Sequence, residues 1–147
     1  MTWEAYSGVF GTFWGPKKAS QVLSEGAIVD YTSGYITVAA IAVMSHLGKC
    51  WKTVTASDSD YALTTRIPVQ VQKQVSCKWK ASVLSTDTLL VTHPGTYADL
   101  AGSPVGIDIT IATSDDDAAF ISDFISTSSA LVQLNSQKAM QSGIGTT

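Results

Sequence analysis

The chain has 147 residues, of which 45% are hydrophobic and only 14% are charged, and its formal net charge is −3. This length fits one domain with a buried core. Charge is scarce beside the roughly 25% of an average globular protein, and the few basic residues form no cluster, so nucleic acid is excluded as an expected partner.

No membrane or secretion segment is predicted. The most hydrophobic stretch, residues 35–44, is about half the length that a bilayer span requires and reads as a buried strand. The N-terminus MTWEAYSG lacks the basic and apolar regions of a signal peptide. We therefore expect a protein made in a reducing cytoplasm, whose two cysteines, Cys50 and Cys77, are free and structural.

The first sixteen residues combine aromatic side chains with interleaved glycines that follow no steady period. The aromatic residues are Trp3, Tyr6, Phe10, Phe13 and Trp14. Aromatic area of this size must pack on something, and two interpretations stay open. The segment is either an irregular edge strand of its own domain or an arm that docks on a neighbouring subunit. The division predicted here takes residues 1–16 as an extended docking arm, with these five aromatics as partner-binding residues.

A hairpin is predicted next, over residues 26–43, with its turn at Thr32, Ser33 and Gly34. Gly48 breaks the chain after the hairpin. Residues 55–63 follow as a polar loop that carries Asp58 and Asp60.

The clearest pattern covers residues 67–83, which read IPVQVQKQVSCKWKASV. One face of the alternation is apolar and consists of Val69, Val71, Val75, Cys77, Trp79 and Ala81. The other face is polar and consists of Gln70, Gln72, Gln74, Ser76, Lys78 and Lys80. Successive strand side chains point to opposite sides of a sheet, so this segment predicts one long strand with a buried and a wetted face, typical of antiparallel sheets.

The remaining segments also favour strands. Residues 105–111 alternate as regularly as residues 67–83, and residues 130–134 have strand character. Residues 114–125 fit either a short helix or a strand, with strand favoured by their Ser, Thr and Ile content. The fold class predicted is mainly β: a single antiparallel β-sandwich or β-barrel-like domain over residues 17–135, followed by a polar C-terminal extension, residues 136–147.

No residue pattern indicates catalysis or a cofactor. The two histidines, His46 and His93, stand alone, and the cysteines offer no short ligand pair for zinc. Residues 115–117 are three aspartates without the spacing of a calcium loop. Neither a nucleophile elbow nor a phosphate-binding loop is present. We therefore predict no enzyme and no catalytic, cofactor-binding or metal residues.

The order of these elements resembles the small capsid decoration, or cement, proteins of tailed bacteriophages. The resemblance spans roughly residues 20–135 and depends on the GAIVDY and SGY segments of the hairpin, the IPVQVQ and CKWKASV segments, GTYADL, VGIDITIATSDDDAAF and LVQLN. It implies a structural virion protein on the capsid exterior that bridges major capsid subunits, often as a homotrimer, and that has no catalytic residue. In this family the N-terminal arm is commonly polar, whereas here it is aromatic.

Three other functions stay open from the sequence. A single-stranded RNA phage coat protein has a similar length, but it needs a basic sheet facing the RNA. A tail tube or head completion protein would self-assemble into rings or tubes. A small ligand-binding β-barrel or hydrolase would need a buried cluster of titratable groups.

Overall fold

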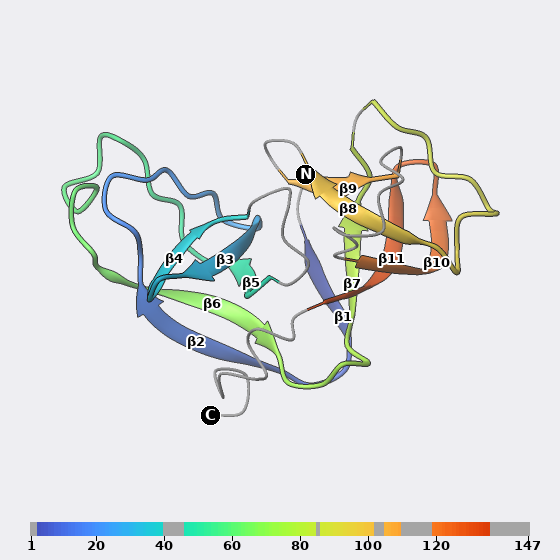
Figure 1. Ribbon diagram of the computed structural model, residues 1–147, viewed down its shortest axis with the longest axis horizontal. Helices are drawn as coiled ribbons and strands as arrows, with labels where there is room; N and C mark the ends of the chain where they lie inside the picture. The colour runs from blue at the N-terminus through green and yellow to red at the C-terminus, as the bar shows by residue number, and fades with distance from the viewer. Residues whose placement is uncertain (1–2, 40–45, 85, 102–104, 110–118, 136–147) are drawn as a thin grey trace.

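The computed structural model describes residues 3–39, 46–84, 86–101, 105–109 and 119–135, and within these ranges the protein is all β. Two antiparallel sheets of six and five strands pack as a sandwich-like fold that does not close into a barrel (Figure 1). The predicted class, a mainly β antiparallel sandwich, is confirmed.

The larger sheet has the order β1-β7-β11-β10-β8-β9. Its strands are β1 (Glu4–Ser7), β7 (Lys78–Ser82), β8 (Tyr97–Ala101), β9 (Gly106–Asp108), β10 (Ala119–Ser126) and β11 (Ser129–Leu134). The favoured strand interpretation of residues 114–125 is confirmed for β10, while residues 114–118 lie outside the described ranges. The same is true of residues 110–111, at the end of the strand predicted around β9, and of the C-terminal extension.

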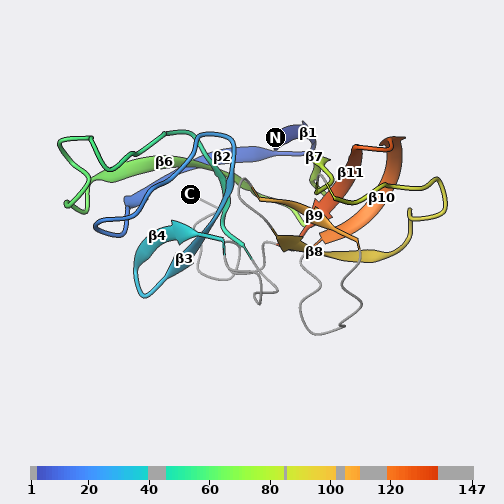
Figure 2. The same cartoon turned by 90° about the horizontal axis from the view of Figure 1, so that it is seen from above.

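The smaller sheet has the order β2-β6-β5-β3-β4. Its strands are β2 (Phe10–Pro16), β3 (Ile28–Thr32), β4 (Tyr35–Val38), β5 (Gly48–Cys50) and β6 (Arg66–Gln72). The sheet is strongly curved, so that β2 and β6 run along one side of the molecule while β3 and β4 lie on the opposite side (Figure 2).

The predicted hairpin is confirmed as β3 and β4. Its two turn residues, Ser33 and Gly34, have positive φ angles of 53° and 86°. Positive φ at both central residues is the geometry that matches the right-handed twist of paired strands, and glycine adopts it without a steric penalty. Residues 40–43, at the end of the predicted second strand, lie outside the described ranges.

The single long strand predicted over residues 67–83 is wrong. It is divided into β6 and β7, which belong to different sheets and are joined by a turn over residues 73–77. Val75, expected on the buried face, is 72% exposed at this turn, and Gln72, expected in water, is fully buried. The alternation is interrupted only at Lys73 and resumes at Val75, so the sequence pattern largely hides the corner.

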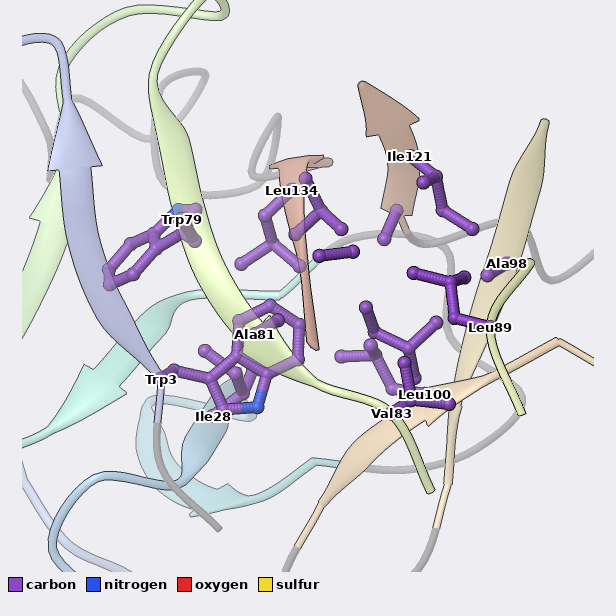
Figure 3. Packing of buried hydrophobic residues seen from close by; sticks show 14 residues of the cluster. Trp3, Ile28, Trp79, Ala81, Val83, Leu89, Ala98, Leu100, Ile121 and Leu134 are labelled. Atoms are coloured by element: carbon purple, nitrogen blue, oxygen red, sulfur yellow. The ribbon is translucent and has the colours of Figure 1, made fainter. Parts of the chain in front are cut away.

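Two hydrophobic clusters stabilise the fold, one for each sheet. The first contains Trp3, Ile28, Trp79, Ala81, Val83, Leu89, Ala98, Leu100, Ile107, Ala119, Ile121, Ala130, Val132 and Leu134 (Figure 3). The second contains Leu23, Val29, Ile36, Leu47, Cys50, Val54, Ile67, Val69 and Val71. Ile28 and Val29 enter different clusters because neighbouring strand residues face opposite ways, so β3 lies between the two cores.

The N-terminal segment is built into both sheets rather than set apart from a domain that begins at residue 17. β1 pairs with β7 and β2 pairs with β6. Trp3 is fully buried, and its indole N–H donates to the Val105 carbonyl at 3.0 Å. Phe10 packs edge-on against Trp79 with ring centroids 4.9 Å apart. The interpretation as an edge strand of the same domain therefore accounts for this segment's backbone.

The polar loop over residues 55–63 is present and is anchored by a buried lysine. Lys17, directly after β2, is fully buried, and its Nζ donates to the carbonyls of Tyr61 at 2.9 Å and Leu63 at 2.6 Å. These charge-assisted hydrogen bonds hold the loop against the end of β2.

Candidate docking surface

The two histidines considered as metal ligands form hydrogen bonds within the fold. His46 is buried, with its Nδ1 3.1 Å from an Asp30 carboxylate oxygen, and its backbone N–H donates to the Asn135 carbonyl. His93 Nδ1 accepts the Leu90 backbone N–H at 2.8 Å. Across the described part of the chain, no three side chains of His, Cys, Asp or Glu come together as metal ligands would.

The cysteines are free and buried, as predicted. Burial raises the pKa of the Cys50 thiol, and the nearby Glu25 carboxylate adds to the shift, so the thiol stays neutral. In the polar loop, the carboxylate of Asp58 accepts the Thr55 N–H at 2.7 Å and closes a turn. The triple aspartate at residues 115–117 lies outside the described ranges.

The most prominent surface feature is a long two-stranded ribbon that crosses from one sheet to the other. Residues 4–16 run antiparallel to residues 66–80, from the pair Glu4 and Lys80 at one end to Pro16 and Arg66 at the other. β1 and β7 form the half that starts at Glu4, and β2 and β6 form the half that ends at Pro16 (Figure 1). Both strands change sheets at the same corner, which is how the corners of sandwich folds are made.

The corner depends on a glycine and one carbonyl. Gly8 has a φ of 108°, and a Cβ at this position would lie 2.6 Å from the Cys77 sulfur. The Val9 carbonyl accepts hydrogen bonds from the Lys73 N–H at 2.9 Å and from the Cys77 thiol at 3.2 Å. The two ends of the 73–77 turn are thereby tied to the opposite strand, so the corner is fixed in one geometry.

Large apolar side chains are exposed along this ribbon. Tyr6 is 63% exposed, Trp14 is 55% exposed, and Val9 and Val75 are exposed at the corner between them. Aromatic and aliphatic groups in such positions are the residue types that anchor protein interfaces. Of the five predicted docking residues, Tyr6 and Trp14 are therefore available to a partner.

The other predicted docking residues are engaged within the molecule. Trp3 is a core residue, not a docking residue, because its side chain is fully buried. Phe10 and Phe13 are partly buried and pack against the two hydrophobic clusters. Val9 and Val75 were not predicted as docking residues, and only the corner that the alternation hides explains their exposure.

Basic side chains surround the ribbon. Arg66 Nη2 donates to the Trp14 carbonyl at 2.7 Å. Lys78 forms an exposed ion pair with Asp123 at 3.2 Å, and hydrogen bonds from Ser122 and Lys78 lower the pKa of that carboxyl. Exposed pairs of this kind are weak and salt-sensitive, so Lys78 remains accessible to an acidic partner.

A polar groove of about 250 Å³ adjoins β1. Its walls are Glu4, Lys80, Ala81, Ser82, Ser128 and Ser129. The groove adds hydroxyl and charged groups at the Glu4 end of the ribbon, which therefore offers both apolar anchors and polar hydrogen-bonding groups, the combination found at protein interfaces.

The described residues contain no helix long and apolar enough to cross a bilayer. No protein-family model, curated protein or solved structure matches this chain.

Proposed function

We propose that this protein is a structural component of a virion, which decorates the outside of a tailed-phage capsid and stabilises it by bridging major capsid subunits. The proposal places it on the capsid exterior as a homo-oligomer, the trimer that the family resemblance implies. The major capsid protein is its partner, and no cofactor is required.

The observation that supports this function best is the set of exposed apolar side chains on a ribbon with a fixed corner. Tyr6 and Trp14 lie on β1 and β2, Val9 and Val75 lie at the corner, and the corner is held by hydrogen bonds to the Val9 carbonyl. A rigid surface loses little conformational entropy on binding, which favours docking without a folding step. The low charge of the chain also makes burial of polar surface in an assembly less costly.

The test uses heads assembled from the major capsid protein that the same genome encodes. A ligand that binds only the assembled head stabilises it by mass action. We expect saturating protein to raise the temperature at which the heads disrupt, as measured by calorimetry and light scattering. An unchanged disruption temperature at proven saturation would overturn the proposal.

A matched pair of tyrosines separates docking through the ribbon from general stickiness. Tyr6 is 63% exposed on β1, and Tyr97 is 62% exposed on β8, toward the opposite side of the same sheet. Tyr6→Ser should weaken co-sedimentation with heads by at least about tenfold, as loss of an interface anchor does. Tyr97→Ser should leave it unchanged, and equal effects of the two variants would show that the ribbon is not the docking surface.

A further inference from the structure

Two of the four edge strands in the sheets are covered by the chain itself. The outer edge of β9 receives the Leu84 N–H at the Ile107 carbonyl, at 2.8 Å. The outer edge of β4 receives the Lys18 N–H at the Ile36 carbonyl, at 2.9 Å, and the side-chain oxygen of Gln21 accepts a further N–H of this strand. Natural proteins cover sheet edges in this way because an open edge can pair with another strand.

β2 differs from these edges: its Pro16 end lies beside β4 through the parallel bridge of Lys17 to Ile36, but the outward peptide groups ahead of that end can be identified. The Pro68 carbonyl accepts the Trp51 N–H, so the peptide groups of Pro68 face β5 rather than β2. Trp14 lies opposite Pro68, so the backbone N–H and the backbone carbonyl of Trp14 both point away from β6. Because a strand repeats every two residues, the backbone N–H and carbonyl groups of Phe10 and Thr12 also point away from β6.

Within the described part of the chain, the outward N–H groups of Thr12 and Trp14 have no hydrogen-bond partner, and the Trp14 carbonyl has only the Arg66 side chain. Ahead of the Pro16 end, the outward groups of Phe10, Thr12 and Trp14 leave room for a short ladder. The fourth edge strand, β1, has four residues and a register shift at Tyr6, which interrupts regular pairing.

Charge indicates which strand would fit this edge. Neither β2 nor β6 contains an acidic residue. Arg66 lies at one end of the pair, and the Lys73 side chain packs against Gly11 near the other end. A second copy paired about a twofold axis would bring these cations together, whereas a strand with acidic ends would complement both of them.

We propose that the outer edge of β2 accepts an extended segment with acidic ends from the capsid protein as an additional β-strand. This inference deepens the proposed function and rests on it for the identity of the partner. The main-chain hydrogen bonds supply affinity, and the exposed Trp14 and Thr12 side chains contact the added strand on its outer face.

The first test uses the capped peptide EVTVTVE and the matched peptide KVTVTVK, followed by calorimetry. Thr12→Pro removes the outward N–H but leaves the β2–β6 ladder intact, because proline is tolerated where the N–H faces away from the sheet. Thr12→Val keeps the N–H. The acidic peptide should bind the wild type and Thr12→Val alike, about tenfold more weakly to Thr12→Pro, and the lysine peptide should bind more weakly than the acidic one.

Amide hydrogen exchange on the wild type decides the question even if Thr12→Pro does not fold. Bound acidic peptide should slow exchange at the N–H groups of Thr12 and Trp14. Peptide that binds without slowing either amide, or no binding at all, would overturn the proposal. Dimerisation of the wild type that Thr12→Pro abolishes, without peptide binding, would assign the edge to a second copy instead.

Assembled heads distinguish this inference from the proposed function. If the wild type and Thr12→Val bind heads and Thr12→Pro does not, the result supports both capsid decoration and strand addition to β2. If folded Thr12→Pro binds heads as well as the wild type, strand addition to β2 is wrong and decoration stands. If none of the three binds heads, decoration is wrong, and a peptide that protects the Thr12 amide would still identify β2 as a strand-accepting edge for another acidic partner.

Discussion

Gln72 shows how a single polar side chain can join the two halves of the ribbon. It is fully buried, its Oε1 accepts the Trp79 indole N–H at 2.9 Å, and its Nε2 donates to the Gln74 carbonyl at 3.0 Å. Gln72→Ala leaves a buried N–H unpaired and should lower the free energy of unfolding by about 1–3 kcal/mol. Denaturant titration checks this, with Gln74→Ala, an exposed side chain, as the control. Equal effects from the two variants would show that the bond to Trp79 does not matter for stability.

Cys50 makes a prediction about alkaline pH. Burial raises the pKa of its thiol above the ordinary value of 9.0, so the folded protein holds this proton while the unfolded chain releases it. The stabilising contribution is fully present below pH 9.0 and is lost as pH rises toward the folded-state pKa. The difference in unfolding free energy between wild type and Cys50→Ala should therefore shrink in denaturant titrations at rising pH. A difference that stays constant above this pH would contradict the assignment.

At the scale of elements, β1 and β2 should be indispensable to the fold. Deletion of residues 1–16 removes one strand from each sheet and strips Trp3 from the first core. We expect the truncated chain to lose its cooperative melting transition in circular dichroism, because burial of a large aromatic side chain contributes about 3–5 kcal/mol. Tyr6→Ser serves as the control and should melt as the wild type does. A truncated chain with a sharp transition would restore the interpretation of a separate arm.

Part of the strands was predictable because short-range patterns encode them, whereas β5 begins at Gly48, which was expected to break the chain. The hairpin of β3 and β4, the inward side chains of β7 and the strand character of β10 all follow from alternation and turn residues. The corner at residues 73–77 was not predicted, because KQVSC breaks the alternation of the strands on either side only at Lys73. A local pattern also does not reveal which strands pair. The sequence therefore showed that the N-terminal aromatic side chains must pack, but not which sheet or core they pack against.

At the scale of the whole molecule, the candidate docking surface is a product of the two sheets together. Tyr6 belongs to one sheet and Trp14 to the other, and they lie on one ribbon only because β1 and β2 are consecutive in one bent strand. From sequence, both residues could be proposed as docking groups by their chemistry. Only the three-dimensional arrangement shows that Tyr6 and Trp14 are exposed while Trp3 is buried, because all three lie in the same aromatic segment of the sequence.

The ribbon also has a consequence for how the chain reaches its native state. Glu4 must find Lys80, and Pro16 must find Arg66, across long intervening stretches that form other parts of the molecule. Closing such loops costs entropy before any contact offsets it, and topologies rich in distant pairings fold slowly. During synthesis the first two strands leave the ribosome well before their partners exist. Their open edges and aromatic side chains are then exposed to other nascent chains, and the interval before β6 and β7 emerge is when misassociation threatens this protein most.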